Sequence, residues 1–179
     1  MRHRVVLAVG SNLGDRLGTL QGCMQAIGGL PDTDVLAISP VYETAPVGGP
    51  AQSDYLNAVV IVSTGLRPLD LLTAIQGIEA AFGRVRPQGA ERFGPRTLDI
   101  DIISYAEEVS GDPVLTLPHP RAHERAFVLA PWHDIDAGAS LPGRGPVAAL
   151  LAGLDRRGVR RQPDLVLRRP EPGVAVDSP

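Results

Sequence analysis

Asp99 and Asp101 stand two positions apart in the otherwise apolar run LDIDII. Side chains alternate along an extended backbone, so both carboxylates are expected on one face of a strand. A segment broken by Gly and Pro precedes them and carries the arginines Arg84, Arg86, Arg92 and Arg96. Carboxylate oxygens hold a hard cation such as Mg²⁺, and guanidinium groups hold phosphate oxygens. The combination predicts Mg-dependent phosphate chemistry; the structural alternative is an Arg–Asp ion-pair network.

A second pair of residues that could bind a ligand, Tyr55 and Asn57, precedes the apolar run AVVIV. If that strand begins at Tyr55, both side chains point to one face and place a flat aromatic wall beside an amide that donates and accepts hydrogen bonds. This pairing suits a planar polar molecule. The alternative is that Tyr55 packs at a sheet edge and Asn57 occupies a turn. The run GSNLGD after the first apolar stretch either cradles phosphate on helix N–H groups or forms a plain tight turn.

Other catalytic chemistries have less support. The chain has 17 arginines and no lysine, which excludes a P-loop lysine, a Schiff-base lysine and a lysine base. The single cysteine, Cys23, falls in a helical apolar pattern that predicts a packed thiol. His119 and His123 have a zinc-like spacing but too few further ligands. Phosphate handling would therefore depend on arginine, backbone N–H groups and a metal.

The chain of 179 residues with 44% hydrophobic residues predicts one globular domain. We assign that domain to residues 1–160 and a flexible tail, rich in arginine and proline, to residues 161–179. No apolar run approaches the roughly 20 residues that span a bilayer, and no signal segment is visible, so a cytoplasmic protein is expected. The net charge of −3 argues against general affinity for nucleic acid. We expect a monomer.

The elements that would position these residues follow from periodicity. Strands are predicted at residues 4–9, 35–42, 58–62 and 97–105, and amphipathic helices at residues 13–27 and 68–82. A hairpin at residues 107–117, a helix start within residues 117–127 and a short apolar helix at residues 147–154 follow. The order βαββαβ predicts an α+β fold, a ferredoxin-like sandwich with an antiparallel sheet and an additional hairpin and helices. A Rossmann domain would need stricter alternation and a GxGxxG turn.

Six segments carry a family resemblance: GSNLGDR, SPVYETAPVG, DYLNAVV, GRVR, RFGPRTLDIDII and LPHPRAHERAFVLAP. In this order they closely resemble the 6-hydroxymethyl-7,8-dihydropterin pyrophosphokinases of folate biosynthesis. The resemblance extends from Val5 to about Pro131 and implies a ferredoxin-like fold. It also implies transfer of the β,γ-pyrophosphoryl unit of ATP to the pterin hydroxymethyl group, with release of AMP and two magnesium ions as cofactors.

The resemblance implies a role for each matching residue. Asp99 and Asp101 would bind magnesium, and Arg84 and Arg96 would act on the phosphates in catalysis. The substrate-binding residues would be Thr44, Pro46, Tyr55, Asn57, Phe93 and Phe127, with Tyr55 and Phe127 on either side of the pterin ring. The ATP site would include Gln76, Glu79, Arg86, Ile102, Thr116, His119 and Arg125. Residues 84–95 would form a lid over both substrates, and Phe93 stands where many members place tryptophan.

Two other function classes fit parts of the sequence. A noncatalytic ferredoxin-like module could bind RNA through the arginine-rich end, although paired carboxylates repel phosphate unless a metal intervenes. Another Mg-dependent transferase could move a single phosphoryl group, in which case the product would be ADP and not AMP. The identity of the nucleotide product therefore separates the two transferase hypotheses.

Overall fold

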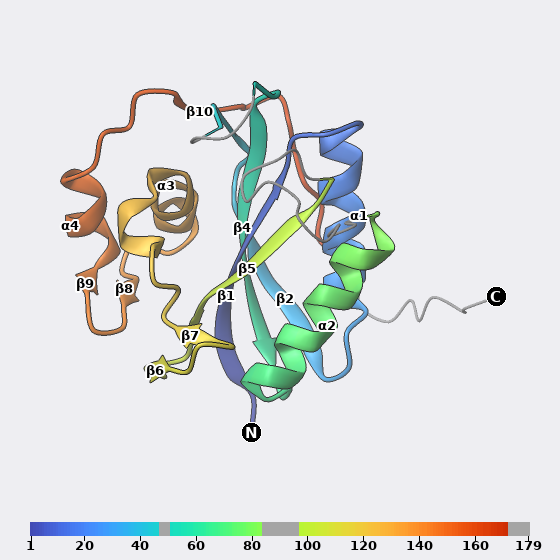
Figure 1. Ribbon diagram of the computed structural model, residues 1–179, viewed down its shortest axis with the longest axis vertical. Helices are drawn as coiled ribbons and strands as arrows, with labels where there is room; N and C mark the ends of the chain where they lie inside the picture. The colour runs from blue at the N-terminus through green and yellow to red at the C-terminus, as the bar shows by residue number, and fades with distance from the viewer. Residues whose placement is uncertain (47–50, 84–96, 172–179) are drawn as a thin grey trace.

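A central antiparallel sheet lies between two layers of helices in the computed structural model, which describes residues 1–46, 51–83 and 97–171 (Figure 1). The strands are β1 (His3–Ser11), β2 (Thr33–Ile38), β3 (Tyr42–Thr44), β4 (Tyr55–Thr64), β5 (Asp99–Tyr105) and β10 (Val159–Arg161). Their order is β10-β3-β4-β1-β5, with β2 also paired to β4, and every pairing is antiparallel. The expected mixed α/β fold with an antiparallel sheet is confirmed.

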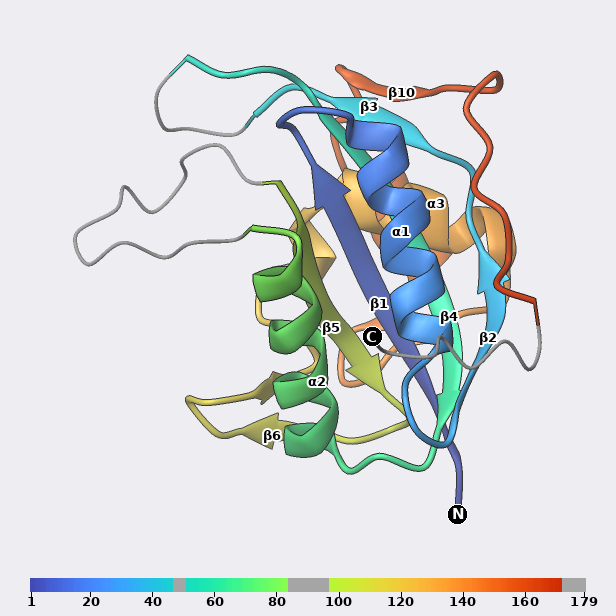
Figure 2. The same cartoon turned by 90° about the vertical axis from the view of Figure 1, so that its right-hand side faces the viewer.

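Helices α1 (Arg16–Gly28) and α2 (Pro68–Ala81) cover one face of the sheet (Figure 2). Asp15 caps α1 because its side chain accepts a hydrogen bond from the Gly18 N–H at 3.0 Å. Pro68 begins α2, where its fixed φ suits the first helical position and its missing N–H leaves no bond unmade. Leu13 lies before α1 and is half exposed, so it does not belong to the buried stripe of that helix.

The opposite face is covered by α3 (Ala126–Ile135) and α4 (Val147–Ala152), preceded by the short helix η1 (Ala122–Glu124). Two small hairpins lie outside the main sheet: β6 (Ser110–Gly111) with β7 (Thr116–Leu117), and β8 (Ser140–Leu141) with β9 (Gly145–Pro146). None of the helices in the described ranges is long and apolar enough to cross a membrane.

Alternation along β5 divides its side chains between the two layers. Ile100 and Ile102 pack with Leu98 in the cluster under α1 and α2, whereas Ile103 packs in the cluster under α3 and α4. The odd-numbered positions Asp99 and Asp101 therefore face the side of α3, as the two-residue period predicts. The hydrophobic cluster under α3 and α4 covers one end of this face of the sheet. The other end, where Asp99 and Asp101 lie, lines a pocket.

The single strand predicted at residues 35–42 is two strands, because Pro40 interrupts the ladder between β2 and β3. Proline has no N–H to donate, and central strands exclude it for that reason. Ser39 replaces part of the ladder: its N–H donates to Val59 O at 2.9 Å, and its hydroxyl accepts from Val59 N at 2.8 Å. The break lets β3 form its own pairing with β4 beside the pocket.

The segment after β10 lies against the domain, where the sequence predicts a tail. Gln21 on α1 exchanges two hydrogen bonds with the backbone of Arg168, at 3.0 Å and 2.8 Å. Leu167 is buried in the core under α1, and Leu165 packs against that core. Two hydrogen bonds and two leucines thus attach residues 165–168 to α1 and the core beneath it. In Figure 2 the chain after β10 is drawn in red and runs down the right-hand side of the view.

Candidate active site

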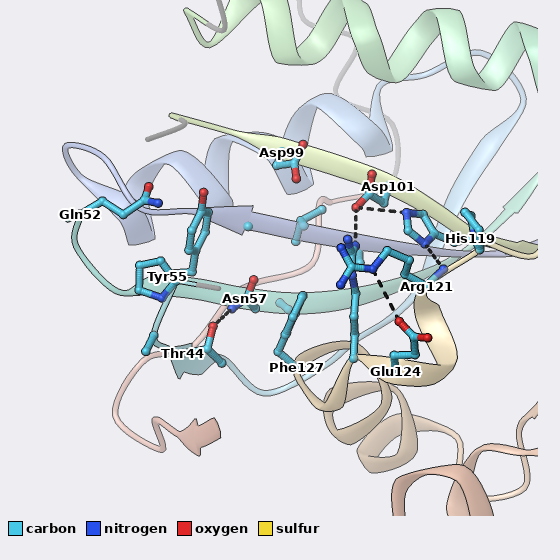
Figure 3. Close-up of a pocket in the computed structure, with 18 residues that line it drawn as sticks. Thr44, Gln52, Tyr55, Asn57, Asp99, Asp101, His119, Arg121, Glu124 and Phe127 are labelled. Carbon is cyan, nitrogen blue, oxygen red and sulfur yellow. Dashed lines mark hydrogen bonds and ion pairs between the residues drawn. The ribbon is translucent and has the colours of Figure 1, made fainter. Parts of the chain in front are cut away.

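A pocket of about 630 Å³ opens at the uncovered end of the sheet (Figure 3). Its walls come from β1, β3, β4, β5 and the segment from His119 to Phe127. Nine residues predicted to form the site line it together: Thr44, Pro46, Tyr55, Asn57, Asp99, Asp101, His119, Arg125 and Phe127. The structure thus joins the predicted planar-ligand side and the predicted carboxylate side in one cavity.

The register of three strands sets the spacing between these two sides. Gly10 on β1 pairs with Asn57 on β4 and with Asp99 on β5, so the three residues form one row across the sheet. Neighbouring strands lie about 4.8 Å apart, which places Asn57 and Asp99 about 10 Å apart. Gly10 lies between Asn57 and Asp99, and because it has no side chain, its backbone forms the floor of the pocket there.

The planar-ligand side consists of two aromatic rings and a buried amide. Asn57 is 8% exposed, and its Nδ2 donates to the Thr44 hydroxyl at 2.6 Å. Tyr55 lies in the neighbouring inward-facing position of β4, and Phe127 reaches the pocket from the first turn of α3. The Arg125 guanidinium lies 5.6 Å from the centre of the Phe127 ring, within the range of a cation–π contact. These side chains provide stacking surfaces around a fixed hydrogen-bonding edge.

The carboxylate side brings Asp101 near a cation and an imidazole. Arg125 Nη1 lies 3.4 Å from Asp101 Oδ2, and His119 Nε2 lies 3.9 Å from the same oxygen. Burial, with a smaller effect of Arg125, lowers the pKa of His119 to about 4, so the imidazole is neutral at pH 7. Its Nδ1 accepts from Arg121 N at 3.1 Å, which leaves the proton on Nε2, the nitrogen that faces Asp101.

The backbone holds His119 in that position. Its N–H donates to Ile103 O at 2.8 Å, so the segment after β7 is fastened to β5 two residues beyond Asp101. The side chain is 18% exposed, and that of Asp101 is 33% exposed. The imidazole is therefore the less exposed of the two groups, and both line the pocket.

Asp99 and Asp101 fit a magnesium site that is completed by substrate. Mg²⁺ prefers hard oxygen donors and is commonly held by one or two carboxylates together with waters and substrate phosphates. Within the described ranges, no group of three or more His, Cys, Asp or Glu side chains is arranged to hold a metal ion by itself. Two partly exposed carboxylates on one strand face match the smaller donor set that Mg²⁺ requires.

Four other predicted site residues do not line this pocket: Gln76, Glu79, Ile102 and Thr116. Gln76 is exposed on α2, whereas Glu79 is 3% exposed and its Oε1 accepts from Ile100 N at 2.8 Å. Glu79 thus holds the backbone of β5 between the two aspartates. Ile102 is buried in the core, and Thr116 lies in the β6–β7 hairpin. The predicted residues Arg84, Arg86, Phe93 and Arg96, and the predicted lid, lie outside the described residues.

Sequence reasoning did not assign Gly10, Gln52, Arg121 or Glu124 to the pocket that they line. Gly10 carried a usable signal, since a glycine inside a strand often marks the close approach of a ligand or of another chain segment. Its position as the first residue of the turn-forming run GSNLGD led to a turn assignment instead. Arg121 and Glu124 form an ion pair at 3.6 Å on the pocket rim, and their spacing of three residues could have suggested the pair but not its place in the pocket.

The fold and pocket define an α+β domain in which two aromatic rings and a buried amide lie in one pocket with two carboxylates of a neighbouring strand. Residues 6–137 match the family 7,8-dihydro-6-hydroxymethylpterin-pyrophosphokinase (HPPK), and the chain belongs to this family. It is 40% identical over 163 residues to the 2-amino-4-hydroxy-6-hydroxymethyldihydropteridine pyrophosphokinase of Pseudomonas aeruginosa, covering 91% of this chain and 99% of that protein. Identity to the protein of the same name from Mycobacterium leprae is 45% over 191 residues, covering 97% and 96% of the two chains.

Solved structures show the same fold at low sequence identity. A crystal structure of HPPK-DHPS in complex with substrates is 12% identical, with a TM-score of 0.65 over 84% of this chain. Wild-type Plasmodium falciparum HPPK-DHPS with pterin and p-hydroxybenzoate is 14% identical, with a TM-score of 0.65 over 85% of this chain. This chain spans 43% and 42% of those two longer chains.

Proposed function

We propose that the protein transfers the pyrophosphoryl group of ATP to 6-hydroxymethyl-7,8-dihydropterin in folate biosynthesis. The hydroxymethyl oxygen attacks the β-phosphorus, the bond between that phosphorus and the α,β-bridging oxygen breaks, and AMP leaves. The hydroxyl proton goes to solvent, so the products are the pterin diphosphate, AMP and H⁺. One observation carries the proposal for a member of this family: a single pocket holds both the planar-ligand wall and the paired carboxylates.

The wall of the pocket suits a pterin. Tyr55 and Phe127 would stack on the two faces of the ring, while Asn57 and Thr44 would hydrogen-bond its polar edge. Pro46 would close the side near β3. Because Asn57 is buried and already fixed by Thr44, little ordering entropy is lost when the ring binds. The spacing across Gly10 would then direct the hydroxymethyl group toward β5.

The carboxylate side suits phosphates that arrive with a cation. Asp99 and Asp101 would hold Mg²⁺, two ions in our proposal, which supplies charge neutralisation and orientation of the phosphate oxygens when bound. Arg125 and the Nε2–H of neutral His119 would contact phosphate oxygens from the opposite rim. Transfer then depends on positioning and charge stabilisation and needs no nucleophilic side chain.

The remaining assignments extend this proposal. Arg84 and Arg96 would act on the transferring phosphates, Arg86 would contact ATP and Phe93 would contact the pterin. The nucleotide would be supported by Gln76, Glu79, Ile102 and Thr116. The hydrogen bond from Ile100 N to Glu79 suggests that Glu79 acts by holding β5.

We further propose the ferredoxin-like class, because the strand order β5-β1-β4 followed by β2 and β3 agrees with a βαββαβ unit. Four further points stay predictions: the domain division near residue 160, the monomeric state, the absence of nucleic-acid binding and the cytoplasmic location.

An assay of nucleotide products tests the function. Purified protein is incubated with ATP, Mg²⁺ and 6-hydroxymethyl-7,8-dihydropterin, and AMP, ADP and pterin diphosphate are separated by chromatography. We expect AMP and pterin diphosphate in equal amounts, with neither formed when Mg²⁺ or pterin is omitted. Production of ADP with a pterin monophosphate would instead indicate transfer of a single phosphoryl group. Absence of any pterin-dependent product from folded protein would overturn the proposal.

A further inference from the structure

An ion-pair cluster of Arg16, Glu43, Asp54 and Arg160 lies next to the candidate active site without lining it. Arg16 Nη1 donates to Glu43 Oε2 at 2.9 Å and to the Asp54 carbonyl oxygen at 2.8 Å. Arg160 Nη2 donates to Glu43 Oε1 at 3.2 Å and to Asp54 Oδ2 at 3.1 Å. Two cations and two carboxylates thus form a closed, charge-balanced set.

The cluster joins segments that are distant in the sequence. Arg16 begins α1, Glu43 lies at the centre of β3, and Asp54 directly precedes β4. Arg160 lies on β10 and pairs across the ladder with Glu43, while the neighbouring Val159 pairs with Thr44. The C-terminal strand, which runs beside β3 in Figure 2, is therefore fastened to β3 by backbone and side chains.

Two members of the cluster are adjacent to side chains that line the pocket. Glu43 immediately precedes Thr44, whose hydroxyl accepts the hydrogen bond from Asn57, and Asp54 immediately precedes Tyr55. Because side chains alternate along a strand, Glu43 points to the face opposite Thr44. The cluster thus holds the backbone of both strands from behind the wall formed by Thr44, Tyr55 and Asn57.

We infer that Arg16, Glu43, Asp54 and Arg160 are positioning residues for the pterin wall, so that the C-terminal strand β10 contributes to pterin binding without touching the ligand. The inference rests on the proposed function, since it names what that wall binds. Loss of a cluster arginine would let β3 and the start of β4 move relative to each other. The stacking ring and the hydrogen-bonding amide would then lose their fixed spacing, whereas Asp99 and Asp101, on β5 beyond β1, would keep theirs.

The exposure of the side chains sets the size of the effect. Exposed fractions are 30% for Arg16, 24% for Glu43 and 56% for Arg160, so solvent screens the pairs and their contribution to overall stability is small. Hydrogen bonds from Arg16 and Arg160 lower the pKa of Glu43, which keeps it charged at neutral pH. A change in the geometry of the wall, rather than unfolding, is the expected consequence of cutting one pair.

The test compares Arg160→Gln with Arg161→Gln, which removes the same charge from the next residue of β10. Pterin affinity of the free enzyme, KM for pterin, KM for ATP and the midpoint of thermal unfolding are measured for both and for wild type. We expect Arg160→Gln to weaken pterin binding about threefold, the range that one partly screened pair supports, with ATP KM and unfolding midpoint unchanged. Arg161→Gln should match wild type, and Arg160→Lys should recover part of the pterin affinity.

The dependence of pterin affinity on salt concentration separates a positioning role of the ion pairs from a merely structural role. Raising ionic strength from about 0.1 M to about 1 M shortens the Debye length from about 10 Å to about 3 Å. The pterin affinity of wild type should fall over that range, whereas Arg160→Gln, already without the pair, should change less. Dihydropterin is neutral near pH 7, so the salt effect reports on the protein rather than on the ligand.

The outcomes separate this inference from the proposed function. Wild type that forms pterin diphosphate and AMP, together with an Arg160→Gln variant of unchanged pterin affinity and unchanged salt response, would overturn the positioning role and leave the function standing. Equal loss of ATP and pterin affinity, or a lowered unfolding midpoint, would assign the cluster to general stability and also overturn it. Wild type that binds no pterin would overturn the function and this inference together.

Discussion

Gly10→Ala should weaken pterin binding while leaving the protein folded. A Cβ atom at residue 10 would lie 2.9 Å from Asn57 Oδ1 and 3.5 Å from Tyr55 Cδ1. Ordinary contact begins at 3.4 Å, so the Asn57 oxygen must move by about 0.5 Å. Gly10 is not among the glycines with positive φ, so alanine fits the backbone there, and the strand itself gains propensity.

The size of the effect follows from the bonds that Asn57 makes. Moving its amide strains the 2.6 Å hydrogen bond to Thr44, and a net intramolecular hydrogen bond contributes about 0.5–1.5 kcal/mol. The amide also leaves the position in which it would bond the pterin edge. We therefore expect the pterin Kd to rise about tenfold, equivalent to about 1.4 kcal/mol, and ATP binding to stay near the wild-type value.

Titration calorimetry with the pterin, together with KM values for both substrates, measures the change. Gly153→Ala is the matched control, because it adds the same methyl group at the end of α4, away from the pocket, with its nearest neighbour at 3.6 Å. If Gly10 acts through Asn57, the double variant Gly10→Ala/Asn57→Ala should bind pterin no more weakly than Asn57→Ala alone. Unchanged pterin affinity in folded Gly10→Ala, or full additivity in the double variant, would refute this account of the pocket floor.

Three further predictions concern the strand below the pocket and the core. Asp99→Asn and Asp101→Asn keep the side-chain shape but remove charge, so each should lower turnover about a hundredfold or more with a normal circular dichroism spectrum; near-normal turnover in both would exclude them as metal ligands. Glu79→Ala leaves the buried Ile100 N–H without its 2.8 Å acceptor, which should reduce the free energy of unfolding by about 1–3 kcal/mol in denaturant titrations, whereas Glu79→Gln should lose less because it retains an acceptor. Burial raises the pKa of Cys23 to about 12; the thiol therefore stays protonated at pH 8 and should react with a thiol reagent only after unfolding, so rapid labelling of native protein would contradict its burial.

Local pattern alone determined several features correctly. The two-residue period of a strand requires no partner, so Asp99 and Asp101 could be assigned to one face together with Ile103, and Ile103 does pack on that side. The start of α2 is also local, since Pro68 needs only its own ring geometry, whereas α1 begins at Arg16, three residues after the predicted start. Pro40 shows the opposite case: the strand predicted at residues 35–42 continued through it, but its missing N–H split that strand into β2 and β3.

Only the tertiary structure decided how these elements meet. The row Asn57–Gly10–Asp99 depends on the register of β1 against two partners, and a register is set by the packing of whole faces rather than by any one segment. The bonds from Arg160 to Glu43 and from Gln21 to Arg168 join residues 117 and 147 positions apart. Residue spacing predicted a carboxylate pair and an aromatic–amide pair. Strand register placed the two pairs in one pocket. That register involves contacts between distant segments, which form only when the whole chain packs.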